Sequence, residues 1–290
     1  MRNIKKNSTI YLFVLPAILY LMIFIFYPLF RGMIISFQKY GIGGSNGFVG
    51  FENYINVIKD KTFITSVVNT LMISFGILII GFSFPILVAL GLNQITNKYF
   101  KKFSQSIVYI PHLLSWVVIL GLWMNILSTD GIINSFLKNF GVIDKSITFF
   151  SKESFARPLI VLMTIWKDMG YTSIIYLASL VTINPNLYEA ADIDGATMIH
   201  KVRYIILPHL VPTMKVVFLI TLMGVLRTFD SVFIMSNGMI ADKIRTAIVY
   251  TYEKGILKFD LGLATAGAIL IFLGTMFFTV LTKKIIKYND

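Results

Sequence analysis

The chain has 290 residues, of which 56% are hydrophobic and 14% are charged, whereas soluble domains carry about 25% charged residues. This composition and the mean hydropathy of +0.77 argue against a single soluble globular domain, and they exclude a disordered chain, which needs low hydrophobicity. The net charge of +12 fits the cytoplasmic flanks of membrane helices better than nucleic-acid binding, and the absence of cysteine excludes disulfides and thiolate metal sites.

Six apolar segments are each long enough to cross a bilayer, which takes about 20 residues. In chain order they are residues 11–30, 67–92, 106–127, 158–183, 212–235 and 261–282. Charged residues interrupt the fourth segment, at Lys167 and Asp168, and the fifth, at Lys215, Arg227 and Asp230. The sequence therefore predicts an all-α integral membrane protein in which residues 1–290 form one domain with six transmembrane helices.

The amino-terminal segment has one feature of a secretion signal, since Arg2, Lys5 and Lys6 precede its apolar stretch. The stretch is too long for a signal, and no small-x-small cleavage site follows it, so we expect a permanent helix. Raw counts of Lys and Arg do not separate the two sides of the membrane. Their density is higher in residues 1–10, 93–105, 184–211 and 284–290, which favours a cytoplasmic location for both termini and for the loop of residues 184–211.

Motifs for catalysis are missing from the sequence. It has no P-loop, no His-Glu-x-x-His pattern and no Gly-x-Ser-x-Gly turn. Asp168 and Asp230 are the acidic residues within the expected helices, and each lies close to a basic residue, Lys167 or Arg227, which argues against the aspartate dyad of an intramembrane protease. We therefore predict no catalytic residue, no metal site and no cofactor bound by this chain, with a membrane enzyme as an alternative.

The loop of residues 184–211 is expected to hold a short helix outside the bilayer. Asn186 can cap this helix, with Glu189 three residues later in a partial capping box. Small residues around Gly195 allow close approach of another backbone, and Pro208 is expected to end the helical stretch. Such an element can be held by a groove in a soluble partner, or it can rest on the membrane helices as an ordinary loop.

The same loop resembles the "EAA" loop of permease subunits in binding-protein-dependent ABC importers. The resemblance lies in Glu189-Ala190-Ala191, Asp194-Gly195-Ala196 and Ile206-Leu207-Pro208, and it extends through residues 184–213. Residues 49–54 (VGFENY) are similar to the first outer loop of the sugar permeases. Residues 109–118 (YIPHLLSWVV) and 166–171 (WKDMGY) are similar to the sub-branch that handles complex oligo- or polysaccharides. Asn237-Gly238-Met239 departs from the Gly-Gly-Pro of many sugar permeases.

This resemblance implies the type I ABC importer permease (MetI-like) fold and a transport subunit, not an enzyme, that moves an oligosaccharide or other carbohydrate across the bacterial plasma membrane. The implied partners are a second homologous permease, in a heterodimer, two cytoplasmic ATPase subunits that hold ATP and Mg²⁺, an extracellular sugar-binding lipoprotein and membrane lipid, but no nucleic acid. The residues implied in coupling to the ATPase are Glu189, Ala190, Ala191, Asp194 and Gly195. Glu189 would meet a basic residue there, and Gly195 would form the turn between two short helices.

Polar side chains in the expected membrane helices are candidates for a sugar pathway, because charges there are costly and usually face a cavity. The candidates are Lys167, Asp168, Tyr171, Arg227, Asp230, Ser231 and Asn237. Salt bridges among the four charged residues, within a helix or between two helices, are an equally good interpretation. Asn69 and Asn125 are expected to form hydrogen bonds between helices instead.

An ion-coupled secondary transporter of a small polar solute is the alternative function. It predicts inverted repeats and a binding site on broken helices at the bilayer midplane. The sequence shows no such internal symmetry, so ATP-driven import is the main prediction.

Overall fold

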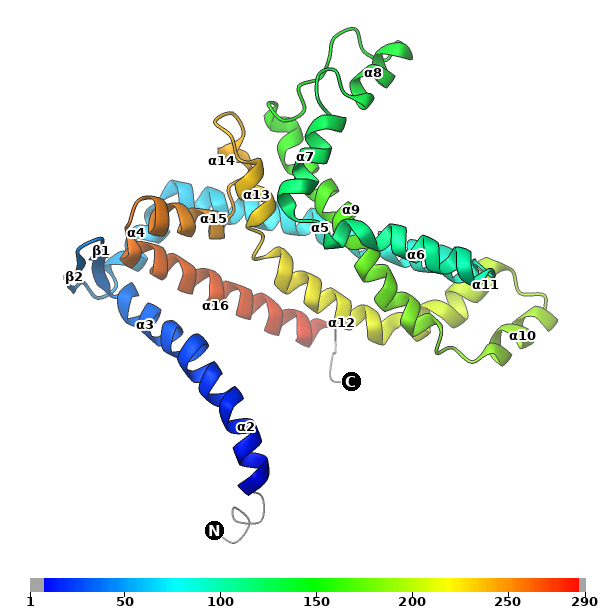
Figure 1. Ribbon diagram of the computed structural model, residues 1–290, viewed down its shortest axis with the longest axis horizontal. Helices are drawn as coiled ribbons and strands as arrows, with labels where there is room; N and C mark the ends of the chain where they lie inside the picture. The colour runs from blue at the N-terminus through cyan, green and yellow to red at the C-terminus, as the bar shows by residue number, and fades with distance from the viewer. Residues whose placement is uncertain (1–7, 287–290) are drawn as a thin grey trace. The chain divides into compact units, whose positions relative to one another are not determined.

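The computed structural model describes residues 8–286 of the chain and is mostly helical (Figure 1). It divides into two compact units. The first is formed by the chain up to Ile64 together with Tyr250–Leu273, and the second by Thr65–Val249 together with the chain from Gly274 onward. Helices α5 (Lys61–Gln94) and α16 (Leu261–Ile285) contribute residues to both units.

The first unit begins with a continuous apolar helix made of α2 (Ser8–Leu21), the π-helical turn η1 (Met22–Phe26) and α3 (Tyr27–Ser36). The antiparallel strands β1 (Gln38–Gly41) and β2 (Gly44–Phe48) and the helix α4 (Glu52–Lys59) follow it. The Asn53 side-chain amide donates to the carbonyls of Ser36 and Gln38, at 2.9 Å each. These bonds join the end of α3, the sheet and α4.

Asp60 connects the start of α5 to α15 (Ala247–Tyr252) and η3 (Glu253–Leu257) within the first unit. Its carboxylate accepts hydrogen bonds from the Tyr250 hydroxyl and the Thr62 amide, both at 2.8 Å, and lies 3.0 Å from Nζ of Lys254. Burial raises the pKa of Asp60, but these donors outweigh it and hold that pKa below its ordinary value. Burial, with the hydrogen bond to Asp60, raises the pKa of Tyr250.

In the second unit, α9 (Glu153–Leu180) packs against α6 (Lys98–Leu113), α7 (Trp116–Ile126) and α12 (Leu207–Val225). One apolar core, around Ile160 and Met163, joins α5, α7, α9 and α13 (Asp230–Met235). A second core, around Tyr176 and Leu210, joins α5, α9 and α12. The remaining elements are α8 (Ile132–Asn139), α10 (Pro185–Ile193), α11 (Met198–Lys201), η2 (Val202–Ile206) and α14 (Ala241–Ile244).

Within residues 8–286, four helices are long and apolar enough to cross a membrane. They are Leu12–Ser36, Lys61–Gln94, Met198–Val225 and Leu261–Ile285. Helices α6 and α7 qualify only as a pair, and they are bent by 103° at the break between them. Helix α9 is long enough but carries Lys167 and Asp168 in its middle. The described helices thus give four or five candidate spans where six were predicted, and Arg2, Lys5, Lys6 and residues 287–290 lie outside the described part.

The third predicted span, residues 106–127, is not one helix. Helix α6 ends at Leu113 and α7 begins at Trp116. Pro111, in the last turn of α6, has no N–H to bond to the preceding turn, and Ser115 caps α7 by accepting a hydrogen bond from the Val118 amide. Hydropathy does not detect this break, because the residues on both sides are apolar.

The fifth predicted span, residues 212–235, also differs from the structure. The helix begins at Met198, passes through η2 and ends at Val225, and α13 is a separate helix. The prediction that Pro208 ends the helix is wrong, because this residue lies in the first turn of α12. The wide π-helical turn before Pro208 accommodates a residue that cannot donate a backbone hydrogen bond.

Candidate functional site

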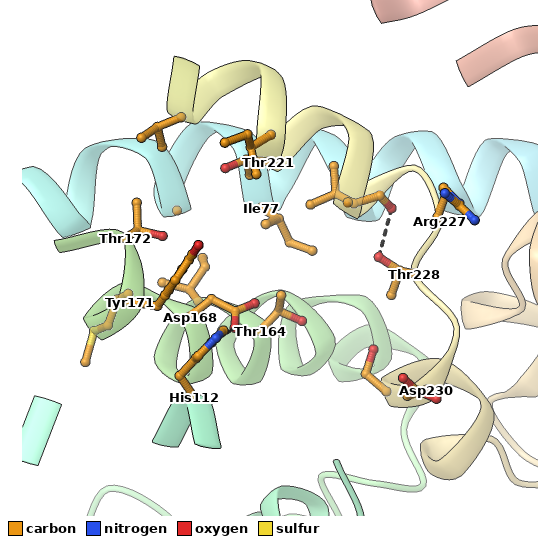
Figure 2. A pocket seen from close by; sticks show the side chains of 18 of the residues that line it. Ile77, His112, Thr164, Asp168, Tyr171, Thr172, Thr221, Arg227, Thr228 and Asp230 are labelled. Carbon is orange, nitrogen blue, oxygen red and sulfur yellow. Dashed lines mark hydrogen bonds and ion pairs between the residues drawn. The ribbon is translucent and has the colours of Figure 1, made fainter. Parts of the chain in front are cut away.

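A cavity of about 330 Å³ lies in the second unit, with walls from α5, α9, α12 and α13 (Figure 2). His112, from the last turn of α6, and Trp116, from the first turn of α7, also line it. Thr164, Asp168 and Tyr171 lie on one face of α9, because residues four and three positions apart in a helix point the same way. The cavity therefore forms next to two helix breaks, one between α6 and α7 and the other between α12 and α13.

His112, Asp168 and Tyr171 form a cluster at one end of the cavity, opposite Arg227 and Asp230 (Figure 2). Nδ1 of His112 lies 3.0 Å from Oδ1 of Asp168. The His112 ring stacks on the Tyr171 ring, with centroids 4.5 Å apart and planes 11° from parallel. An aromatic face next to a carboxylate is the combination that sugar-binding pockets use.

Two hydroxyl groups in the cavity wall have no hydrogen-bond partner within the described structure. They belong to Thr164 of α9, which is 8% exposed, and Ser231 of α13, which is 3% exposed. A buried hydroxyl without a partner costs about 1–3 kcal/mol. Ser231 was predicted from the sequence and Thr164 was missed, although its position one turn before Asp168 places it on the same face.

Lys167 is adjacent to Asp168 in the chain but is not part of the cavity wall. Its side chain is buried, and Nζ donates to the carbonyls of His112 at 2.6 Å, Leu114 at 2.8 Å and Pro111 at 3.4 Å. These carbonyls lie at the end of α6. Lys167 therefore bonds to the backbone where α6 ends and α7 has not yet begun, whereas the sequence suggested a sugar contact or a salt bridge for this residue.

Arg227 and Asp230 line the cavity where α12 ends and α13 begins, as Figure 2 shows. Both are exposed, and in the part of the chain that the structure describes neither side chain forms an ion pair. The suggested salt bridge between them is not formed, because three positions within a helix would bring them together but the chain is not helical between Arg227 and Asp230.

Asn237 lies outside the cavity wall. Its side chain donates to the Phe150 carbonyl at 3.1 Å and accepts from the amides of Met239 and Ile240. These bonds fix the turn after α13. The structure therefore gives Asn237 local backbone partners in place of the expected position on a pathway.

The expected interhelical hydrogen bond of Asn69 is confirmed. Its Oδ1 accepts from Nη2 of Arg157 in α9 at 2.6 Å, and its Nδ2 donates to the carbonyls of Asp242 and Arg245. The same prediction for Asn125 is wrong. The Asn125 amide donates to the carbonyl of Gly121 in its own helix, one turn earlier.

The loop between α9 and α12 carries the second candidate site, and Figure 1 shows α10 within it. Asn184 is the N-cap of α10, two residues earlier than the predicted Asn186, because Pro185 suits the first helical position, where no N–H is needed. Gly195 forms the turn between α10 and α11 with a φ of +71°, which favours glycine. Asp192 pairs with Lys201 across this turn.

The outer surface of this loop is exposed and combines acidic with apolar side chains. Glu189, Ala190, Asp194 and Gly195 are exposed, and Ala191 is half-buried. Within the described residues, the Glu189 carboxylate has no hydrogen bond or ion pair. Ile193, at 86% exposed, adds an apolar contact. This surface can receive both a basic group and an apolar surface from a partner.

The sequence profile of one family, described as the binding-protein-dependent transport system inner membrane component, matches residues 81–287. A polygalacturonan/rhamnogalacturonan transport system permease protein of Bacillus subtilis is 34% identical over 267 residues, covering 90% of this chain and 82% of the relative. An arabinooligosaccharides transport system permease protein of the same bacterium is 31% identical, covering 97% and 89%.

A solved structure is similar to the chain over nearly its full length. It is the crystal structure of a bacterial ABC transporter involved in the import of the acidic polysaccharide alginate, with a TM-score of 0.90, 30% identity and coverage of 99% of this chain and 97% of that one. A second crystal structure shows a bacterial alginate ABC transporter in complex with an alginate pentasaccharide-bound periplasmic protein. Its matching chain has a TM-score of 0.89 and 31% identity, and the match covers 98% of this chain and 96% of that one.

Proposed function

This chain belongs to the family of binding-protein-dependent transport system inner membrane components, and we propose how its parts move a carbohydrate through the membrane. The chain is a multi-pass permease subunit of a carbohydrate ABC importer in the bacterial plasma membrane, with the MetI-like type I fold. The observation that carries the proposal is the exposed loop around Glu189 and Gly195, on the chain segment that joins two helices of the cavity wall.

The proposed topology has six spans with both termini in the cytoplasm. The spans are α2–α3, α5, the bent pair α6–α7, α9, α11–α12 and α16. Helix α9 can be included despite its two central charges, because Lys167 is compensated by three carbonyls and Asp168 by His112. This order places the loop between α9 and α12 on the cytoplasmic side, where a soluble ATPase can reach it.

The proposed coupling element consists of Glu189, Ala190, Ala191, Asp194 and Gly195. The Glu189 carboxylate is exposed, and a basic group of a partner can bind it. Small side chains at Ala190 and Ala191 let the partner's surface come close to the helix backbone. Separate ATPase subunits, which hold ATP and Mg²⁺, would transmit their closure through this contact to α9 and α12.

The proposed sugar pathway passes through the cavity and uses Asp168, Tyr171, Arg227, Asp230 and Ser231. Tyr171 offers an aromatic face, and the charged and hydroxyl groups offer hydrogen bonds to sugar hydroxyls. His112 and Thr164 complete this set. Lys167 and Asn237 are assigned to holding the surrounding backbone.

The proposed partners are a second, homologous permease and an extracellular sugar-binding lipoprotein. A structural relative in complex with a periplasmic protein supports the second of these. The named relatives transport oligo- or polysaccharides, and two of the named substrates, polygalacturonan and alginate, are acidic. We therefore propose an oligosaccharide as the substrate.

Uptake by intact cells tests the function. Cells with and without this chain are given labelled oligogalacturonide, alginate pentasaccharide, arabino-oligosaccharide and lactose. Import of one of these should require the chain and should persist when an uncoupler is added while ATP is held constant. Import that stops with the uncoupler would instead support an ion-coupled transporter.

A further inference from the structure

We propose that Lys167 is a positioning residue that fixes the break between α6 and α7 and thereby holds His112 in the cavity wall. The inference rests on the proposed function of the cavity, and it assigns a role to a charge that does not itself line the cavity. Lys167 lies on α9, and the break lies 53 to 56 residues earlier in the chain.

The Lys167 ammonium group has as many N–H donors as there are carbonyl groups within its reach at the break between α6 and α7. A helix end leaves carbonyl groups without partners, and an ammonium group has three N–H donors. Nζ of Lys167 lies within hydrogen-bond distance of three carbonyls there, at 2.6, 2.8 and 3.4 Å. Lys167 is only 9% exposed, so these carbonyls replace the water that a charged group would otherwise need.

The backbone near Lys167 leaves little freedom for the break to move. A Cβ atom at Gly170, one turn further along α9, would overlap the carbonyl group of Val108 in α6. The two backbones therefore touch directly at this level. Nζ of Lys167 also lies 5.9 Å from the centre of the Trp116 ring, at the start of α7, within range of a cation–π contact.

Lys167 and Asp168 contact different parts of the same break, Lys167 its backbone and Asp168 the His112 side chain. Successive residues of a helix point about 100° apart, so Lys167 reaches the backbone of the break while Asp168 reaches the side chain of His112 on the cavity side. The His112 ring in turn stacks on Tyr171. Without the ammonium group, the carbonyls of His112 and Leu114 lose this donor, Pro111 keeps only the Leu114 amide at 3.2 Å, and His112 is no longer held in register with Asp168 and Tyr171.

The test uses the full importer, purified through a tag on this chain and reconstituted in nanodiscs. The ATPase rate is measured against the concentration of whichever probe is imported, among oligogalacturonide, alginate pentasaccharide, arabino-oligosaccharide and lactose. Lys167→Met should raise the apparent KM for that sugar about tenfold, in line with the loss of a hydrogen bond to a charged group, and should leave kcat within about twofold. Lys102→Met, at an exposed lysine of α6, is the matched control and should leave both unchanged.

A double-mutant cycle separates positioning from a general structural role. If Lys167 acts through His112, then His112→Ala should raise KM by a similar factor, and adding Lys167→Met to it should raise KM no further. An unchanged KM in either single variant, or factors that multiply in the double variant, would overturn the proposal.

Failure of a variant to assemble and failure of the wild type are also decisive. If the importer with Lys167→Met does not assemble, the importer with Lys167→Gln is measured instead. Glutamine keeps two N–H donors, so the expected rise in KM is about threefold. If neither variant assembles, Lys167 is needed for folding and the positioning role is wrong. A wild-type complex without sugar-stimulated ATP hydrolysis would overturn the proposed function and this inference together, whereas a working wild type with an unaltered Lys167→Met variant overturns this inference alone.

Discussion

Oδ1 of Asp168 lies 3.0 Å from Nδ1 of His112, although the two residues are 56 positions apart and belong to different helices. The contact exists because α6 ends just after His112 and packs against α9. Continuing α6 as a straight helix would carry the following residues away from the cavity. The packing of α6 on α9 therefore brings an imidazole next to the carboxylate of Asp168 and, through stacking, next to the ring of Tyr171.

We expect Asp168→Asn to weaken sugar binding. The substitution keeps the size of the side chain but removes the negative charge that holds His112 and that we propose accepts bonds from sugar hydroxyls. Losing one hydrogen bond to a charged group corresponds to an increase of about tenfold in the apparent KM of import. Uptake of the imported oligosaccharide measures it. Asp144→Asn, at an exposed acid in the α8–α9 connection, is the control, and equal KM values for the two variants would contradict the prediction.

Hydropathy located most of the long helices but not their interruptions. The break at Leu114-Ser115 lies within apolar sequence, so local polarity carries no signal for it, and the three carbonyls it exposes are compensated by Lys167 from another helix. The turn at Gly195 was foreseen from the family resemblance, and the positive φ there is a local property of the chain. The turn at Gly195 was thus predictable, whereas the break between α6 and α7 depends on a side chain from another helix and was not predicted.

The loop between α9 and α12 gives the second prediction. Glu189→Ala removes the exposed carboxylate, and Gly195→Pro demands a negative φ where the structure has +71°. Both variants should insert normally while transport and sugar-stimulated ATP hydrolysis fall about tenfold or more, since one charged contact is worth about 1.5–3 kcal/mol.

Matched controls for this loop are Glu52→Ala, at an exposed glutamate of α4, and Gly43→Ala, at a turn glycine with open space around it. Uptake and ATP hydrolysis should stay at the wild-type level in both controls. Full activity in Glu189→Ala and Gly195→Pro would refute the assignment of this loop as the coupling element.

Gly170→Ala should destabilise the contact between α6 and α9. The added Cβ would overlap the carbonyl group of Val108, which belongs to backbone and cannot turn aside as a flexible side chain would. Overpacking of this kind costs about 1–3 kcal/mol. The thermal midpoint of the detergent-solubilised chain should fall by several degrees, whereas Gly91→Ala, in open space on α5, should not lower it.

The cavity shows which site residues a sequence can reveal. Asp168, Tyr171, Arg227, Asp230 and Ser231 all line it and were candidates because polar groups are rare in apolar helices. Thr164 shares a helix face with Asp168, so helical spacing could have found it. His112 could not be found in this way, because only the packing of α6 on α9 brings it to Asp168.

Acidification should remove the stabilising effect of Asp60. The pKa of Asp60 is lower in the folded than in the unfolded chain. Its contribution to the free energy of unfolding is therefore complete well above the ordinary pKa of 3.8. That contribution is lost as the pH falls from there towards the pKa in the folded chain. The difference in thermal midpoint between wild type and Asp60→Asn should therefore shrink between about pH 6 and pH 3. Tyr250→Phe removes one donor and should make the total loss smaller; a difference that grows on acidification would contradict this account.

Thr164→Val and Ser231→Ala should have opposite effects on stability and on binding. Each removes a buried hydroxyl that has no partner within the described structure, so the thermal midpoint of the sugar-free protein should stay the same or rise. If the sugar supplies the missing partner, the apparent KM should rise about fivefold to tenfold in each variant, as expected for a neutral hydrogen bond. Thr265→Val provides the control, because that hydroxyl is already bonded to the carbonyl of Leu261 at 2.7 Å and lies outside the cavity. A lower midpoint with unchanged KM would show that the two hydroxyls serve packing and do not face the transported sugar.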